Sequence, residues 1–185
     1  MISWHLFGSS KIAVRVESID EAGAGLRAAL AAGPKVRTIW LLFDPTSNEV
    51  APWLESAKTA SPEIRGMMVQ RFFARILTKA GYDIIVGREL DIFARCRLRS
   101  IFVEVKSSLA GGRFGSKADI SQLDGYLIAC ERNCAERWLG TMGIIKPVCL
   151  RDGFRAAMRR RNIGLIDVRW VSTKETLLPH LQSVP

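Results

Sequence analysis

The alternation of apolar and polar residues divides the chain into stretches with a strand period and stretches with a helix period. Strands are predicted at 11–17, 36–43, 82–87, 90–94, 101–105, 144–150 and 164–171, and helices at 21–32, 62–80, 119–138 and 152–161. Because strands and helices follow one another along most of the chain, we expect an α/β fold.

Local residues mark where several of these elements begin and end. Ser61-Pro62-Glu63 combines an N-cap, a proline in the first turn and an early acid, and Gly81 is suited to end the helix that follows. Residues 45–62 are rich in Pro, Ser, Thr and Asn, and are expected to be a linker with a helical turn around Trp53. Residues 109–117 are expected to be a Gly-rich basic loop.

This order predicts three regions. Residues 1–60 form a small N-terminal β-α-β module, residues 61–171 form the main domain, and residues 172–185 form a tail. The N-terminal module contains no recognisable catalytic pattern, so its role stays open.

Charge changes this picture, because the chain carries a formal net charge of +9 and has a pI near 9.9. Such an excess indicates a polyanionic partner, with nucleic acid favoured over an acidic membrane surface. No run of 18 apolar residues and no signal-peptide pattern is present, so we expect no membrane span and a cytoplasmic location.

Candidate chemistry is concentrated in residues 89–108. Side chains on a strand alternate between faces, so Glu104 and Lys106 project from the same face. A hairpin can bring Asp91 from the preceding strand alongside Glu104. Carboxylates buried in an apolar segment are costly unless they are paired or hold a cation. The alternative is that Glu104 and Lys106 form an ordinary solvated strand face.

Further polar and basic residues follow this stretch. Gln122 and Tyr126 are four residues apart, on one face of a predicted helix. Side chains suited to contacting a phosphate backbone are Arg113 and Lys117 in the Gly-rich loop and Arg151, Arg155 and Arg159 at helical spacing. The loop is equally compatible with a plain connector.

From residue 62 onward the order of elements, with Asp91 and then Glu104-Val105-Lys106, resembles the PD-(D/E)XK nuclease superfamily. The stretch from Gln122 to Tyr126 looks like the QxxxY motif of its RecB-type branch. The resemblance covers residues 62–170 and implies a restriction-endonuclease-like core, a mixed sheet with helices on both faces. The N-terminal β-α-β appendage is outside it.

The resemblance also implies roles for individual residues. Asp91, Glu104 and the carbonyl of Val105 would bind Mg²⁺ or Mn²⁺, and Lys106 would orient the attacking water and stabilise charge. Gln122 and Tyr126 would position the phosphate or the nucleophile.

The sequence departs from this family in its first core helix. Related nucleases commonly carry a glutamate there, where this chain has Gln70, and Glu63 lies nearly two turns earlier. Both are auxiliary candidates. The departure leaves the number of metal ions open.

These observations predict a magnesium-dependent deoxyribonuclease acting in DNA repair, recombination or processing. The alternative is a non-catalytic nucleic-acid-binding module with the same fold. A metal-independent nuclease of the tRNA-splicing type is disfavoured because the two histidines lie near the chain ends. DNA is the expected partner, and a symmetric homodimer is compatible with the sequence.

Overall fold

The computed structural model describes residues 3–7, 10–33, 35–85, 91–97, 99–132 and 135–172. The strands are β1 (Ser3–Phe7), β2 (Lys11–Val16), β3 (Thr38–Phe43), β4 (Asp83–Ile85), β5 (Ile92–Cys96), β6 (Arg99–Ala110), β7 (Arg113–Phe114), β8 (Glu136–Lys146), β9 (Cys149–Leu150) and β10 (Gly164–Trp170). The helices are α1 (Ile19–Ala31), α2 (Val50–Thr59), α3 (Pro62–Lys79), α4 (Lys117–Arg132) and α5 (Asp152–Arg160).

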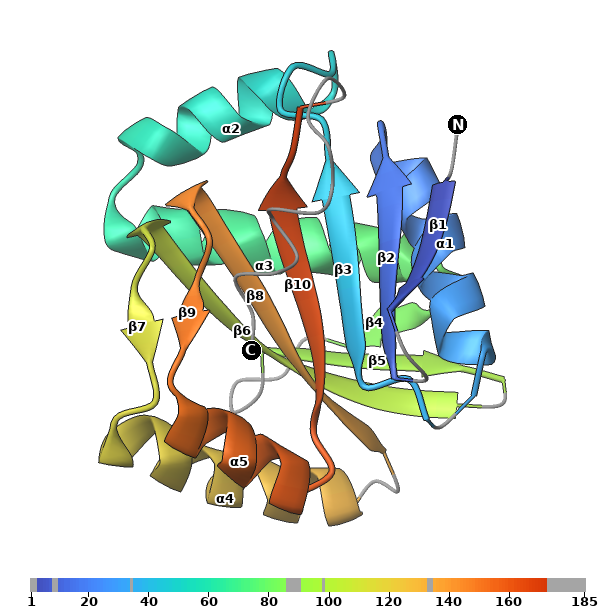
Figure 1. The fold of residues 1–185 in the computed structure, drawn as a ribbon, viewed down its shortest axis with the longest axis vertical. Helices are drawn as coiled ribbons and strands as arrows, with labels where there is room; N and C mark the ends of the chain where they lie inside the picture. Colours follow the sequence, from blue (N-terminus) through green and yellow to red (C-terminus); the bar gives the residue numbers. More distant parts are fainter. Residues whose placement is uncertain are drawn as a thin grey trace.

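Within the described residues, eight strands form a mixed sheet in the order β1-β2-β3-β10-β8-β6-β5-β4 (Figure 1). The five central strands, from β2 to β6 in this order, are parallel to one another. At the margins β1, β5 and β4 pair antiparallel. Strands β7 and β9 form a separate parallel pair. The predicted α/β class with a mixed sheet is confirmed.

Helices cover the two faces of the sheet. One face packs with α1, α2 and α3, and Figure 1 shows α3 crossing behind the strands. The other face contributes Phe102 and Leu139 to a smaller core with residues of α4 and α5. Strand β3 is buried on both faces, as its uninterrupted apolar sequence requires in a parallel sheet.

The starts of three helices follow from their local sequence. Ser18 and Ser61 cap α1 and α3, because each hydroxyl accepts a backbone N–H three residues later. Before α4, the Ser116 hydroxyl accepts the Asp119 N–H, and the Asp119 carboxylate accepts the Ser116 N–H in return. This reciprocal arrangement is a capping box.

Most predicted elements are confirmed, and the boundary between α4 and β8 is corrected. The helix predicted at 119–138 ends at Arg132, and Trp138 lies in β8, which runs from 136 to 146 instead of the predicted 144–150. The glycines in β8 and its lack of alternation concealed the strand, since it is buried along most of its length. Helix α5 begins at Asp152, as predicted, and its N-cap residue is Arg151.

The predicted linker and loop contain regular structure. Residues 50–59 form the full helix α2, in which Pro52 falls in the first turn where a missing N–H costs little. In the Gly-rich segment, β6 extends to Ala110 and β7 pairs with β9.

Residues 11–43 form the predicted β-α-β unit, and its strands continue the sheet of the main domain through the pairing of β3 with β10. The predicted tail lies outside the described residues beyond Ser172. Among the helices described, none combines the length and apolar character needed to cross a bilayer.

Candidate active site

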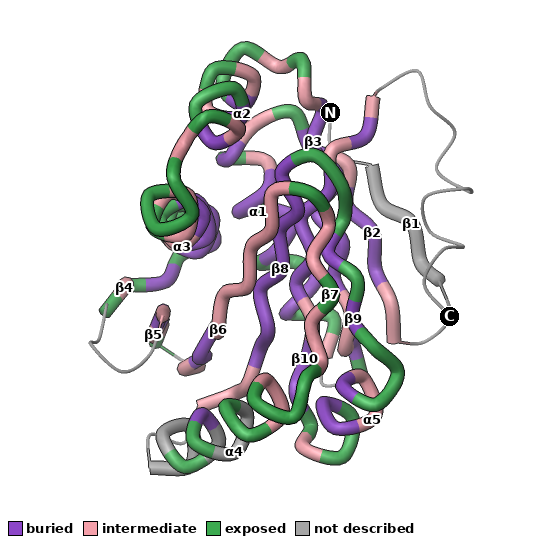
Figure 2. Tube along the Cα trace, turned by 90° about the vertical axis from the view of Figure 1, so that its left-hand side faces the viewer, coloured by how far each residue is buried: buried purple, intermediate pink, exposed green. Residues whose placement is uncertain are grey.

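Strand β6 positions the central pair of the candidate site. Figure 2 shows this strand passing from a buried stretch at 101–103 to a half-buried part that begins at Glu104. Glu104 and Lys106 share the face of Phe102, which packs with α4 and α5. Their side chains are 20% and 18% exposed, so solvent reaches both groups.

Asp91 lies directly before β5 and is held against β6. Its Oδ2 accepts a hydrogen bond from the backbone N–H of Val105 at 2.7 Å. Because the N–H and C=O of an extended residue point to the same side of the strand, the Val105 carbonyl faces the side on which Asp91 lies. The carbonyl of Val105 and the carboxylate of Asp91 therefore belong to one corner of the sheet.

Lys106 connects this corner to α4. Its Nζ donates to Glu104 Oε1 at 3.0 Å and to Gln122 Oε1 at 2.9 Å. An ammonium group has three N–H donors. Within the described residues the third donor is not engaged, so Lys106 retains one hydrogen bond for a ligand.

The pKa of Glu104 responds to the charges around it. Burial raises the pKa of Glu104 first, and the negative charge of Asp91 raises it further, while Lys106 opposes both effects. A cation placed between the carboxylates would relieve this repulsion.

The donor set fits a hard divalent cation. Asp91 Oδ1 and Glu104 Oε2 have no hydrogen-bond partner within the described part of the chain, and oxygen ligands are those that Mg²⁺ prefers. The described residues contain no group of three or more His, Cys, Asp or Glu side chains placed to hold a metal ion. The corner offers two carboxylates and the Val105 carbonyl, and solvent would supply any remaining ligands of a bound cation.

Tyr126 does not lie with Lys106. It is buried, and its hydroxyl donates toward the carbonyls of Phe102 at 2.5 Å and Trp138 at 3.0 Å and accepts the Trp138 N–H at 3.1 Å. The hydroxyl thus bridges β6 and β8. From the same helix, Gln122 is exposed and reaches the corner, so the two residues of the QxxxY motif point to different surroundings.

Of the two auxiliary candidates, Gln70 lies at the corner and Glu63 does not. Gln70 Nε2 donates to the backbone carbonyl of Asp91 at 2.5 Å and so fixes the residue that carries the carboxylate. Glu63 is exposed in the first turn of α3, about 10.5 Å from Gln70 along the helix axis.

Of the five predicted phosphate-contacting residues, Arg113 lies in β7 and Lys117 begins α4, while Arg151 is the N-cap of α5 and Arg155 and Arg159 lie within it. Arg113, Lys117, Arg151 and Arg159 are exposed. Arg155 is half-buried and its Nε donates to the Leu150 carbonyl at 3.0 Å. Lys117 precedes Gln122 by five residues, about 7.5 Å along α4, so basic charge begins close to the corner.

Sequence reasoning missed two features near Lys106. Hydrogen bonds from Gly115 and Ser116 lower the pKa of Asp119, and the charge of Lys106 adds a smaller contribution in the same direction. Across the sheet, Lys106 pairs with Thr141, whose hydroxyl donates to buried Asp167 at 2.6 Å. The register of β6, β8 and β10 creates this row, and no local motif encodes it.

Comparison of the chain with family models, curated proteins and solved structures finds no match. The assignment of chemistry therefore rests on the geometry of the corner.

Proposed function

We propose that the protein is a metal-dependent nuclease that hydrolyses phosphodiester bonds in DNA. The observation that carries the proposal is the convergence of Asp91, Glu104, Lys106 and Gln122 at one corner of the sheet. Asp91 accepts the backbone N–H of Val105 at 2.7 Å. Lys106 donates to Glu104 and to Gln122 at 3.0 Å and 2.9 Å. These are the side chains that two-carboxylate phosphodiester hydrolysis needs.

Asp91 and Glu104, with the Val105 carbonyl, would hold Mg²⁺ or Mn²⁺. Magnesium would supply charge neutralisation at the phosphate and would acidify a water molecule. Burial and the charge of Asp91 raise the pKa of Glu104, so a bound cation would stabilise the charged form of this carboxylate.

Lys106 has one N–H donor left for a phosphate oxygen or the attacking water, and Gln122 and Glu104 fix the direction of that donor. A preorganised cation beside the scissile phosphate stabilises the charge that develops in the transition state. The exposed basic residues of α4 and α5 would bind the flanking phosphates without reading bases.

The test is a cleavage screen with linear duplex, single-stranded and branched DNA in the presence of Mg²⁺ or Mn²⁺. We expect cleavage by the wild type, a loss of at least about 100-fold in Glu104→Gln, and retained DNA binding in that variant. Glu55→Gln is the matched control, because Glu55 is an exposed carboxylate on α2 paired only with Lys58 among the described residues.

DNA binding without cleavage of any substrate would favour the non-catalytic module instead. Gln70 favours that alternative, because an uncharged amide stands where related nucleases carry an acid.

A further inference from the structure

A cavity of about 170 Å³ lies beside α5, against the strands β3 and β10. Its apolar lining consists of Trp40, Leu150, Met158, Ile163 and Leu165. Thr38, which also lines it, lies in the same row of the sheet as Glu104, three strands away. Three strand spacings amount to about 14 Å. The cavity is therefore on the same face of the sheet as the candidate active site but separate from it.

The charged side chains that line this cavity are basic. Among the described residues they are Lys11, Arg37, Arg155 and Arg159, and no acidic residue joins them. The Nζ of Lys11 lies 6.0 Å from the centroid of the Trp40 ring, so the ammonium group is placed over the apolar lining. Arg159 is exposed in the last turn of α5. Within the described part of the chain neither Lys11 nor Arg159 has an acidic partner.

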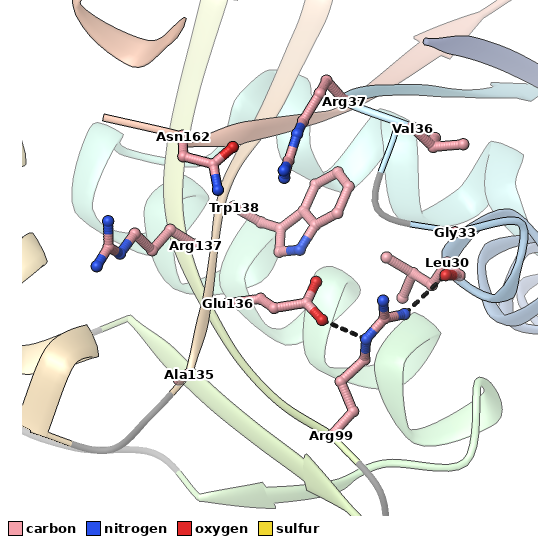
Figure 3. A pocket seen from close by; sticks show the side chains of 10 residues that line it. All are labelled: Leu30, Gly33, Val36, Arg37, Arg99, Ala135, Glu136, Arg137, Trp138 and Asn162. Carbon is pink, nitrogen blue, oxygen red and sulfur yellow. Dashed lines mark hydrogen bonds and ion pairs between the residues drawn. The ribbon is translucent and has the colours of Figure 1, made fainter. Parts of the chain in front are cut away.

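The other two cations are directed elsewhere. The Nε of Arg155 donates to the Leu150 carbonyl at 3.0 Å. Figure 3 shows the Arg37 guanidinium extending into a neighbouring cavity beside Trp138. Lys11 and Arg159 are therefore the cations available to a ligand of the cavity beside α5.

The nearest buried carboxylate does not cancel this positive charge. Asp167 pairs with Trp40 in the register of β10 and β3. Its carboxylate accepts hydrogen bonds from Thr141 at 2.6 Å and from Arg169 at 2.7 Å. Because Arg169 compensates Asp167 within the sheet, the cavity favours an anionic ligand.

Hydroxyl groups and size limit which anion fits. Ser10 and Thr38 are half-buried in the lining, and each hydroxyl can donate and accept a hydrogen bond. A volume of about 170 Å³ is below the roughly 300–1,000 Å³ of sites for drug-sized ligands. A single flat ring with polar edges, joined to a phosphate outside the cavity, fits this lining. An acyl chain has no polar edge and is too long for the space.

We infer that this cavity binds one unpaired nucleobase of single-stranded DNA, with Lys11 and Arg159 on the adjoining phosphates. Apolar and aromatic contacts accept any base, and the phosphate contacts read no sequence. A base enters such a cavity only after it leaves the stack of a duplex. The inference deepens the proposed function by naming single-stranded DNA as the substrate class. It rests on DNA being the partner and not on cleavage.

The test is a fluorescence anisotropy titration of the full chain in the presence of a chelator, which prevents cleavage. The ligands are an oligothymidylate and an abasic strand of the same length. Because the two strands carry equal charge, the ratio of their affinities isolates the contribution of the bases. We expect the wild type to bind the oligothymidylate at least about tenfold more tightly. Thr38→Phe, which occupies the cavity from a half-buried strand position, should remove this preference and leave the affinity for the abasic strand unchanged.

Charge variants test the phosphate contacts separately. Lys11→Gln and Arg159→Gln should weaken the binding of both strands, and each should lower the slope of log affinity against log salt by about 0.7. Arg160→Gln is the matched control, because Arg160 is exposed beside Arg159 on α5 and does not line the cavity. This control should leave both the affinity ratio and the salt slope unchanged.

Methyl-¹³C labelling of methionine in the wild type keeps the test valid if Thr38→Phe does not fold. The Met158 signal should shift on addition of the oligothymidylate, and the signal of Met142, buried on the other face of the sheet, should not. Equal affinity of the wild type for the two strands, a preference retained in folded Thr38→Phe, or an unshifted Met158 signal would overturn the inference. Equal affinity together with binding of anionic phospholipid vesicles would overturn it in favour of a lipid. An intact base preference in a protein that cleaves no DNA would support the inference and contradict only the nuclease proposal.

Discussion

Replacing Tyr126 by Phe separates a structural role of this residue from a chemical one. The substitution removes the hydroxyl that joins the Phe102 and Trp138 carbonyls and the Trp138 N–H, and it leaves the ring in place. We expect the variant to be less stable, with the chemistry at Lys106 retained.

The magnitude follows from the groups that lose their partner. A buried backbone group left without a hydrogen bond costs about 1–3 kcal/mol. For a chain of this size, each kcal/mol lowers Tm by about 2–4 °C, so we expect a fall of about 2–12 °C. Ser56→Ala is the control, because it removes an exposed hydroxyl bonded to the Pro52 carbonyl at 2.9 Å, which water can replace.

The assay combines urea denaturation, thermal unfolding and amide hydrogen exchange. Exchange of the Trp138 N–H should become faster in Tyr126→Phe. If Tyr126→Phe left Tm and the exchange rate unchanged but abolished cleavage activity, the structural role would be refuted. The result would indicate instead that the Tyr126 hydroxyl acts on the substrate.

Two other predictions concern buried charge. Because burial and Asp91 raise the pKa of Glu104, the folded state holds this proton more tightly than the unfolded chain, and the contribution of Glu104 to wild-type stability should fall as pH rises from below 4.5 through the raised pKa. Glu104→Gln should lack this fall in urea titrations across that window, and parallel curves for the two proteins would contradict the shift. Arg169→Met should cost about 3–5 kcal/mol at pH 7, because it leaves the carboxylate of buried Asp167 without its partner at 2.7 Å. Burial already raises the pKa of Asp167, so this cost should shrink as the pH is lowered, and a cost independent of pH would show that packing rather than charge is lost.

The sequence predicts the strands and helices where period and capping agree. Period-two alternation placed Glu104 and Lys106 on one face, and the Ser61 cap located the start of α3. The α4–β8 boundary could not be found this way, because Trp138 suits either a helix or a buried strand and only pairing with β6 and β10 decides between them.

Periodicity also predicted part of the candidate site, but not the contacts between its elements. Spacing placed Gln122 and Tyr126 on one helical face. Because of the way the helix packs against the sheet, buried Tyr126 bonds to the Phe102 backbone carbonyl, whereas exposed Gln122 accepts a hydrogen bond from Lys106. The approach of Gln70 to Asp91 depends on the packing of α3 beside β5, and the Lys106–Thr141–Asp167 row depends on register. Such contacts between distant segments arise only from the tertiary fold.

The central claim is that Asp91 and Glu104 together hold a divalent cation, and direct titration of Mn²⁺ followed by electron paramagnetic resonance tests it. The account predicts saturable binding to the wild type and to Glu55→Gln, and its loss in Glu104→Gln at the same concentrations. Equal binding by Glu104→Gln, or no binding by the wild type at millimolar Mn²⁺, would contradict it.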